Sequence, residues 1–284
     1  MPLESPPFRI IGIVGLGLIG GSIALRARAA WRGVKLLGVD RPAVANEALA
    51  RRIIDQPRAS VAELADADLV VLATPVPELI ELVDAAAQAQ LPGVVTDVGS
   101  TKREILKAAD RARLTRFIGG HPMAGSERSG LGAARPDLFE ARPWLFVDAA
   151  EEAPPVRKLH RFVMGLGARP LHLDATSHDR TMAYLSHLPQ LLAVALMNTA
   201  AEACATDALV ASGRAFREMT RLASSPPDVW KGILATNADF VAEAARSLVE
   251  HLPVSPDRVA DAAVIDEGFA GANQARARLD PSPR

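Results

Sequence analysis

The segment RIIGIVGLGLIGGS, residues 9–22, decides the fold of this 284-residue chain. A run of β-branched residues leads directly into Gly15, Gly17 and Gly20, which have the spacing GxGxxG, and a helical pattern follows them. In such a strand-turn-helix unit the first glycine allows a tight turn, the second lets the backbone approach a pyrophosphate, and the third lets the helix pack closely on the strand. The segment therefore predicts a Rossmann-type dinucleotide site, with the phosphates at a helix N-terminus.

A second strand-like run, VKLLGVD, ends at Asp40, 20 residues beyond Gly20. An acidic side chain at this distance typically binds the ribose hydroxyls of the adenosine. Because a carboxylate repels a 2′-phosphate, Asp40 favours NAD over NADP as the cofactor, while the adjacent Arg41 leaves tolerance of the phosphate open. The strand, the spacing and the acid together favour a nucleotide site over a glycine-rich turn without function.

Short apolar runs alternate with Ala-rich helical segments from Ile10 to about Leu173. The runs are RIIGIVG, VKLLGVD, DLVVLATP, GVVTDVG, RFIGGHP, PWLFVD and ARPLHL. This alternation predicts a doubly wound, mainly parallel sheet, in which ligands bind outside the carboxyl ends of the strands. The rule adds the residues after the run LVVLA to the cofactor site. The predicted cofactor-binding residues are Gly15, Gly17, Leu18, Ile19, Gly20, Asp40, Arg41, Thr74, Pro75 and Val76.

Strand signals stop after Asp174, and the rest of the chain has helical periodicity. One predicted apolar helical face consists of Leu185, Leu188, Leu192 and Leu196. We expect an α/β fold in which residues 1–174 form an N-terminal Rossmann-type doubly wound domain. Residues 175–284 are expected to form an all-helical C-terminal domain that binds substrate and forms a homodimer through Ala-rich faces. From about Gly268 onward we expect a loosely ordered tail.

The composition excludes several classes of function. The 32 Lys and Arg nearly balance the 33 Asp and Glu, so no long-range field selects a nucleic acid or an anionic membrane. The apolar runs are much shorter than the roughly 20 residues that cross a bilayer. The single cysteine, Cys204, has no partner for an internal disulfide, so we expect a small buried residue in a cytoplasmic protein. No spacing of Cys or His is typical of a metal site.

The densest polar stretch of the chain is GGHPMAGSERSG at residues 119–130. A lone histidine at a strand end is usually structural. Here it is accompanied by TDVGSTK at residues 96–102, SHDRTMAYLSHLPQ at residues 177–190 and FREMTR at residues 216–221. Together with the glycine turn, these motifs resemble the prephenate/arogenate (cyclohexadienyl) dehydrogenase family over nearly the whole chain.

The resemblance implies an NAD-dependent prephenate dehydrogenase, which oxidatively decarboxylates prephenate to 4-hydroxyphenylpyruvate in tyrosine biosynthesis. Arogenate, or both acids, as the substrate is an open alternative. The resemblance further implies that His121 is the catalytic histidine and that Ser100 lies near the nicotinamide and helps hold the substrate hydroxyl or that histidine. It also implies that Arg221 binds a carboxylate of the substrate.

Four further residues are implied to contact the substrate. Ser126 and Glu127 match a loop that closes over it, and His187 matches the first histidine of the family's SHLP helix. Gln190 stands where several members have a second histidine, so recognition of the substrate side chain is open at this position.

The residue types suit the reaction independently of the resemblance. A neutral imidazole, with an ordinary pKa of roughly 6.5, accepts a hydroxyl proton near neutral pH. The planar guanidinium of arginine binds both oxygens of a carboxylate and stays charged. A dry cleft would hold the base and the cation in place while the substrate ring loses a hydride to the nicotinamide and becomes aromatic.

Two alternatives remain. A β-hydroxyacid dehydrogenase or imine reductase also has a Rossmann domain followed by helices, but the plausible lysine here, Lys231, lacks the Gly-rich setting that such enzymes use. A non-catalytic NAD-binding sensor would have kept the fold and lost the chemistry. The presence of Ser100, His121 and Arg221 together argues against a sensor.

Overall fold

The computed structural model describes residues 5–126, 128–253 and 255–279. Its centre is an eight-stranded sheet in the order β3-β2-β1-β4-β5-β6-β7-β8. All neighbouring strands are parallel except β6 and β7, which run antiparallel. The strands are β1 Ile10–Val14, β2 Lys35–Val39, β3 Gln56–Arg58, β4 Leu69–Leu72, β5 Val94–Asp97, β6 Phe117–Pro122, β7 Pro143–Val147 and β8 Arg169–Leu173.

The predicted α/β class and the doubly wound, mainly parallel sheet are confirmed. The seven predicted apolar runs supply seven of the strands, and β3 was not anticipated. Its sequence, QPR, is polar, and it lies at the sheet edge beside β2, so it needs no apolar pattern. This strand is defined by its parallel pairing with the apolar strand β2 and not by an apolar pattern of its own.

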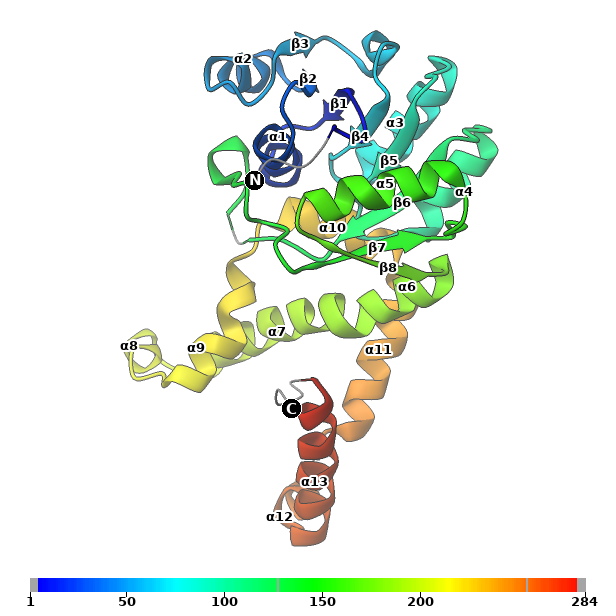
Figure 1. The fold of residues 1–284 in the computed structure, drawn as a ribbon. Coiled ribbons are helices and arrows are strands. Elements are labelled where there is room, and N and C mark those ends of the chain that lie inside the picture. The colour runs from blue at the N-terminus through cyan, green and yellow to red at the C-terminus, as the bar shows by residue number, and fades with distance from the viewer. Residues whose placement is uncertain (1–4, 127, 254, 280–284) are drawn as a thin grey trace.

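Helices cover both faces of the sheet because successive strand residues point to opposite sides. Leu36 packs into one apolar cluster and Leu37 into the other, and Val71 and Val70 alternate in the same way. The first cluster contains α1 Leu18–Ala30, α2 Pro42–Ala50 and α5 Pro154–Gly165. The second contains α3 Val76–Gln88 and α4 Arg103–Arg111. The sheet is thus buried between two layers of helices (Figure 1).

The chain after β8 is helical, and most of its elements extend away from the sheet (Figure 1). They are α6 Ala175–Met182, a π-helix η3 Ala183–His187, α7 Leu188–Ala203, α8 Thr206–Leu209, α9 Arg214–Thr220, η4 Arg221–Ser224, α10 Pro227–Thr236, α11 Ala238–His251, α12 Pro256–Ala260 and α13 Ala262–Leu279. The change from strand to helix coincides with the predicted boundary at residues 174 and 175, and the division into two domains stays a prediction.

One helix of this region returns to the sheet. Ile233 of α10 is buried in the cluster that contains α3, and Trp230 packs against the same cluster. Gly232 allows this approach, since a Cβ at that position would lie 2.5 Å from Pro77. The helix α10 therefore closes one side of the space above the strand ends.

Several expectations about the helical region are corrected. Leu185 is 72% exposed and Leu192 is 39% exposed, because the π-helix between α6 and α7 breaks the regular spacing on which the predicted face relied. Cys204 is exposed at the end of α7 rather than buried. The segment after Gly268 is helical as far as Leu279 instead of forming a loose tail. Within the described ranges, no helix is long and apolar enough to span a bilayer.

Candidate functional site

The candidate site lies at the carboxyl ends of the central strands, where two cavities adjoin. The first, the His121 pocket, has a volume of about 530 Å³ and contains residues from the glycine turn, from the loops after β4, β5 and β6, and from α10. The second, the Asp40 cavity, has a volume of about 790 Å³. Gly17, Ala73, Thr74 and Pro75 line both cavities, so together they form one elongated site.

Each of the three glycines of the turn is required for a different structural reason. Gly15 has a φ of +92°, and a Cβ there would lie 2.5 Å from the carbonyl oxygen of Ala73. A Cβ on Gly20 would overlap the carbonyl oxygen of Gly15. No atom lies within 4 Å of a Cβ built on Gly17, which caps the N-terminus of α1. The space in front of Gly17 and the unpaired amides of the first turn of α1 fit a pyrophosphate.

The Asp40 cavity has the character of an adenosine site. Asp40 stands at the end of β2, and its Oδ2 accepts a hydrogen bond from the backbone nitrogen of Leu16 at 2.7 Å, which fixes the carboxylate against the glycine turn. Glu78 and Glu81 also line the cavity, and Arg41 is the only cation among its described lining residues. Three carboxylates against one exposed guanidinium oppose an additional phosphate, which agrees with NAD rather than NADP.

A buried polar atom supports the fit of the cofactor. The hydroxyl of Thr74 is buried and has no hydrogen-bond partner among the described residues, and Thr74 lines both cavities. Buried hydroxyls normally have a partner. A dinucleotide that crosses from one cavity to the other would pass this hydroxyl and supply a partner for it.

His121 occupies the end of β6 and faces the pocket with 8% of its surface exposed. Its Nδ1 lies 2.9 Å from Nε2 of His178, and Nδ1 of His178 lies 2.8 Å from Oδ1 of Asp179. Burial lowers the pKa of His121 well below its ordinary value, and the charges of His178, Lys102 and His187 lower it further. At neutral pH the imidazole is therefore neutral and able to accept a proton.

A buried ion pair fixes the strand ends beneath His121. The ammonium of Lys102 pairs with Asp97 and donates to the carbonyl oxygen of Gly120 at 2.7 Å, and both charged side chains are fully buried. The other oxygen of Asp97 accepts from the backbone nitrogen of Gly120 at 3.0 Å. Burial lowers the pKa of Lys102 although Asp97 acts to raise it. This pair connects the loop after β5, which carries Ser100, to the residue before His121.

Ser100 and Ser126 line the His121 pocket, as do the predicted cofactor residues Leu18, Ile19 and Val76. Glu127 lies outside the described residues. His187 does not line the pocket, although its neighbour Ser186 does. His187 is buried and lies 3.2 Å from the side-chain nitrogen of Asn237, and burial lowers its pKa to about 4.

Gln190 and Arg221 are not brought into the pocket. The side-chain nitrogen of Gln190 donates to the carbonyl oxygen of Leu222 at 2.8 Å, and its oxygen accepts from the hydroxyl of Ser225 at 3.2 Å. Gln190 thus supports the segment that carries Arg221 instead of facing a substrate. Arg221 is exposed, is absent from the pocket lining, and makes no side-chain hydrogen bond or ion pair with any described residue. Its predicted role stays a prediction.

Four residues of the site were not predicted from the sequence. Arg128 and Trp230 line the pocket, and Arg128 is the one charged side chain among the described lining residues, since His121 is neutral. The signal for Arg128 was present in the polar stretch at residues 119–130, where only the histidine, serine and acid were selected. His178 and Asp179 were not selected, because nothing local in the sequence shows that α6 packs against β6.

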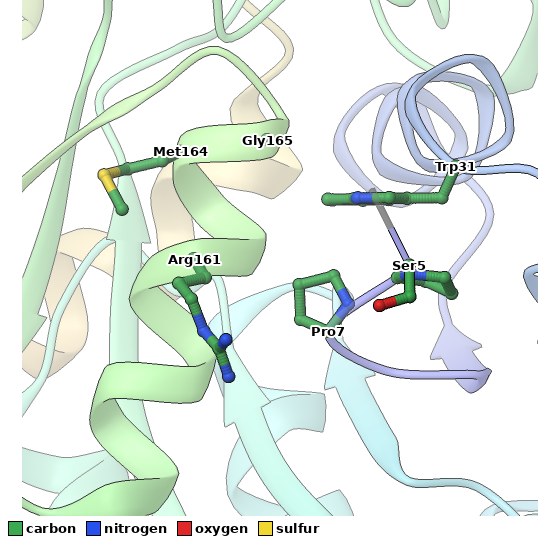
Figure 2. A pocket seen from close by; sticks show the side chains of 7 residues that line it. Ser5, Pro7, Trp31, Arg161, Met164 and Gly165 are labelled. Carbon is green, nitrogen blue, oxygen red and sulfur yellow. The ribbon is translucent and has the colours of Figure 1, made fainter. Parts of the chain in front are cut away.

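Other hollows of the molecule lack this combination. A hollow of about 580 Å³ between the end of α1 and α5 is lined by Ser5, two prolines, Trp31, Arg161, Met164 and Gly165 (Figure 2). Figure 2 shows Trp31 and Met164 on opposite sides of it, with Arg161 below. It contains no histidine and no carboxylate among its described lining residues, and we assign no function to it. In the described ranges no group of three or more His, Cys, Asp or Glu side chains could hold a metal ion.

Comparisons with known proteins give matches over most of the chain. Residues 23–171 match the family model of the prephenate dehydrogenase nucleotide-binding domain, and residues 174–257 match that of its dimerization domain. The chain is 36% identical over 249 residues to the prephenate dehydrogenase of Lactococcus lactis subsp. cremoris, covering 84% of this chain and 68% of that protein. It is 34% identical over 240 residues to that of Bacillus subtilis, covering 81% of this chain and 64% of that protein.

A solved structure is similar over almost the whole length. It is prephenate dehydrogenase from A. aeolicus in complex with hydroxyphenyl propionate and NAD+, with a TM-score of 0.86 and 27% identity. The match covers 98% of this chain and 99% of that chain. The match to B. subtilis, in contrast, spans slightly less than two thirds of that relative.

Proposed function

Because this chain belongs to the prephenate dehydrogenase family, we propose that it catalyses the NAD-dependent oxidative decarboxylation of prephenate to 4-hydroxyphenylpyruvate, a step of tyrosine biosynthesis. The observation that carries the proposal is the placement of a buried, neutral imidazole, His121, in the same pocket as the glycine turn. A base beside a dinucleotide site is what an alcohol oxidation requires.

Different residues bind the cofactor, accept the proton and orient the substrate in the proposed reaction. NAD, when bound, supplies the acceptor for the hydride that leaves the ring carbon. The turn at Gly17 and the first turn of α1 would hold its pyrophosphate, and Asp40 its adenosine ribose. His121 takes the proton of the ring hydroxyl as the hydride leaves that carbon, and Ser100 orients the hydroxyl. Loss of carbon dioxide from the opposite end of the ring is easy because the ring becomes aromatic.

Apolar side chains line much of the His121 pocket and would shield the reacting atoms from water. Trp230 and Ile233 of α10 and Met123 after β6 line it together with Leu18 and Ile19. A low dielectric strengthens the interaction of a fixed dipole or charge with the reacting group. The pocket therefore favours the proton transfer to His121 over exchange with solvent.

The cation that binds the substrate carboxylate is proposed to be Arg221, with Arg128 as a second contributor. Arg221 follows from the family motif, and its exposed guanidinium has no described partner that would compete with an anion. Arg128 lies in the pocket lining itself. A planar guanidinium suits a carboxylate because it donates to both oxygens.

The central experiment measures NADH formation by the purified protein with prephenate and with arogenate, each with NAD and with NADP. We expect activity with prephenate and NAD. We expect His121→Asn to reduce turnover by about 10²-fold or more with NAD affinity little changed, because only the base is lost. Near-normal turnover of that variant would remove His121 from the mechanism. Higher kcat/KM with arogenate would replace prephenate by its amino counterpart as the substrate.

The two arginines are separated by their kinetic effects. Arg221→Gln and Arg128→Gln should each raise the KM for prephenate, since a carboxylate loses a charged partner. A KM that stays unchanged in one variant assigns the carboxylate to the other arginine. Lys231→Gln serves as a matched control. Lys231 is adjacent to Trp230 but is exposed, pairs with Asp228 at 2.7 Å and does not line the pocket, which also argues against a hydroxyacid dehydrogenase that relies on this lysine.

We also propose a homodimer and a cytoplasmic location. The helical region exposes large apolar side chains that a second copy would cover, including Leu185 at 72%, Met219 at 66% and Phe269 at 69% exposure. The match of residues 174–257 to a dimerization domain supports this assembly. Light scattering at micromolar concentration should give the mass of a dimer, and a monomeric mass would contradict the proposal. The exposed thiol of Cys204 is compatible with a reducing compartment, which fractionation of cells would test.

A further inference from the structure

A chain of three polar side chains leads from the His121 pocket into the junction between sheet and helices. His121 belongs to β6, whereas His178 and Asp179 are consecutive residues of α6. The separations are 2.9 Å between the two imidazoles and 2.8 Å between His178 and Asp179. His178 and Asp179 are fully buried, and neither residue lines the pocket. They therefore reach a substrate only through His121.

The carboxylate at the inner end fixes the proton positions along the chain. Burial acts to raise the pKa of Asp179, but hydrogen bonds from His178 and from the backbone of Arg103 and Lys102 lower it overall, so the carboxylate is ionised. An ionised carboxylate only accepts hydrogen bonds, so Nδ1 of His178 must donate to it. In a neutral His178 the other nitrogen, Nε2, is then an acceptor. Nδ1 of His121 must donate to that acceptor, and Nε2 of His121 retains a free lone pair.

Asp179 is itself held from the opposite side by the start of α4. Its Oδ1 accepts from the backbone nitrogen of Lys102 at 2.7 Å, and its Oδ2 accepts from the backbone nitrogen of Arg103 at 3.0 Å. The side chain of Arg103 adds a contact at 3.2 Å. A helix N-terminus stabilises a negative charge, and the two amides have no partner within the helix. The carboxylate is therefore fixed in both position and charge.

The charged groups around the two imidazoles favour their neutral forms. Burial lowers the pKa of His178, with a further lowering by the charge of Lys102, while Asp179 and Asp97 act in the opposite direction. The charges of His187 from η3 and of Lys102, the residue before α4, also lower the pKa of His121. Lys102 is paired with Asp97 and Arg103 with Asp239, so both cations are balanced.

We propose that His178 and Asp179 are positioning residues that hold His121 in the tautomer with the proton on Nδ1, which leaves Nε2 as the base. The inference rests on the proposed role of His121. When the hydroxyl bond of the substrate breaks, its proton forms a bond to Nε2 of His121, and the resulting imidazolium keeps its Nδ1 proton toward His178. The positive charge is then stabilised through His178 by the carboxylate of Asp179. In a serine protease triad, replacing the corresponding aspartate by asparagine costs about 10⁴-fold in kcat through the wrong tautomer.

The tautomer is measured directly by ¹⁵N NMR of the full-length protein with labelled histidine at pH 7.5. The signals of His121 are assigned by their loss in His121→Asn. We expect a neutral ring protonated at Nδ1, with Nε2 unprotonated. A ring protonated at Nε2, or at both nitrogens, would overturn the proposal. This readout does not depend on activity.

Two substitutions at His178 distinguish its contact with His121 from its contact with Asp179. The amide group of His178→Gln reaches the position of Nε2, so its oxygen accepts from His121 while the contact with Asp179 is lost. The amide of His178→Asn reaches the position of Nδ1, so the contact with Asp179 is kept while His121 loses its acceptor. We expect His178→Asn to lose at least about 10²-fold in kcat with prephenate and to lose the Nδ1 tautomer, and His178→Gln to lose markedly less. Equal losses, with the tautomer of His121 unchanged in both variants, would contradict the proposal.

A second pair of imidazoles provides the matched control. His160 of α5 and His172 of β8 lie 2.8 Å apart and away from the pocket, so His160→Gln and His160→Asn make the same chemical changes in an equivalent contact. Both should leave kcat unchanged. Thermal unfolding of all variants reports whether they fold. If His121→Asn keeps normal turnover, the role of His121 as the base fails. If His121→Asn is inactive but the His178 variants match wild type, only the positioning role fails.

Discussion

At the scale of single residues, the decisive quantity is the protonation of His121. A base of ordinary pKa, about 6.5, loses half of its activity at that pH. Burial lowers the pKa of His121 well below this value, and the neighbouring charges act in the same direction. The neutral, proton-accepting form therefore persists as the pH falls through 6.5.

The pH dependence of kcat/KM follows from this shift. In the proposed mechanism activity requires neutral His121 and is lost as the pH falls through the pKa of His121. We therefore expect a plateau from neutral pH to below 6.5 and an acid limb only beneath it. The rate of NADH formation at saturating NAD, measured from pH 5 to pH 9, gives this profile. An acid limb with a midpoint at or above 6.5 would contradict the low pKa.

The glycines of the turn give a second residue-scale prediction, since they differ in what surrounds them. Gly20→Ala places a Cβ against the carbonyl oxygen of Gly15 and should lower the free energy of unfolding by about 2 kcal/mol or more. Gly17→Ala meets no atom within 4 Å and should leave stability nearly unchanged. It should instead raise the Kd for NAD about tenfold, because the backbone loses its close approach to the pyrophosphate. Urea unfolding and NAD titration of both variants test the contrast, and a similar loss of stability in both would contradict it.

At the scale of elements, the short helix η4 depends on α7 for its position. Gln190 of α7 contacts Leu222 within η4 and Ser225 directly after it. None of the residues of η4 is fully buried, and its apolar residues Leu222 and Ala223 are half-buried. The two hydrogen bonds of Gln190 therefore help to fix the segment that carries Arg221.

Gln190→Leu keeps the volume of the side chain and removes both hydrogen bonds. At about 1 kcal/mol for each bond, the KM for prephenate should rise by up to about tenfold. The Kd for NAD should stay unchanged, because no residue of η4 lines the Asp40 cavity. Steady-state kinetics with both substrates varied give the two constants. An unchanged KM would mean that Gln190 has a purely structural contact, and a raised Kd for NAD would mean a general loss of structure.

At the scale of the whole molecule, Arg103 joins the sheet and the helical region. It starts α4, contacts Asp179 of α6 at 3.2 Å, and forms two hydrogen bonds with Asp239 of α11 at 2.6 and 2.7 Å. It also donates to Asn237 at 2.9 Å and stacks over Phe240 at 4.2 Å. Because Asp239 is held by this guanidinium, the pKa of the carboxyl falls to about 2. One side chain thus fixes α4, α6 and α11 in a common arrangement around the pocket.

Arg103→Gln should lower the free energy of unfolding by about 2–3 kcal/mol, because Asp179 stays buried with one cationic partner fewer. It should also lower kcat, since Asp179 positions His178. The matched control is Arg111→Gln at the other end of α4. Arg111 is an exposed arginine 3.6 Å from Asp84, so its removal should cost no more than about 0.5 kcal/mol. Urea unfolding of the two variants checks the difference, and equal losses would contradict the role of Arg103.

The sequence alone determined the sheet, the cofactor turn and the histidine. Strands buried on both faces are written as continuous apolar runs, and the GxGxxG spacing follows from contacts within one strand-turn-helix unit, so both are local. Only the tertiary structure decided that His178 and Asp179 lie behind His121 and that Arg128 and Trp230 line the pocket. It also decided that Gln190 supports η4 instead of facing the pocket. These contacts join residues 32 to 57 positions apart in the chain. No periodicity within an element records such contacts, because they arise only when helices pack against the ends of the strands.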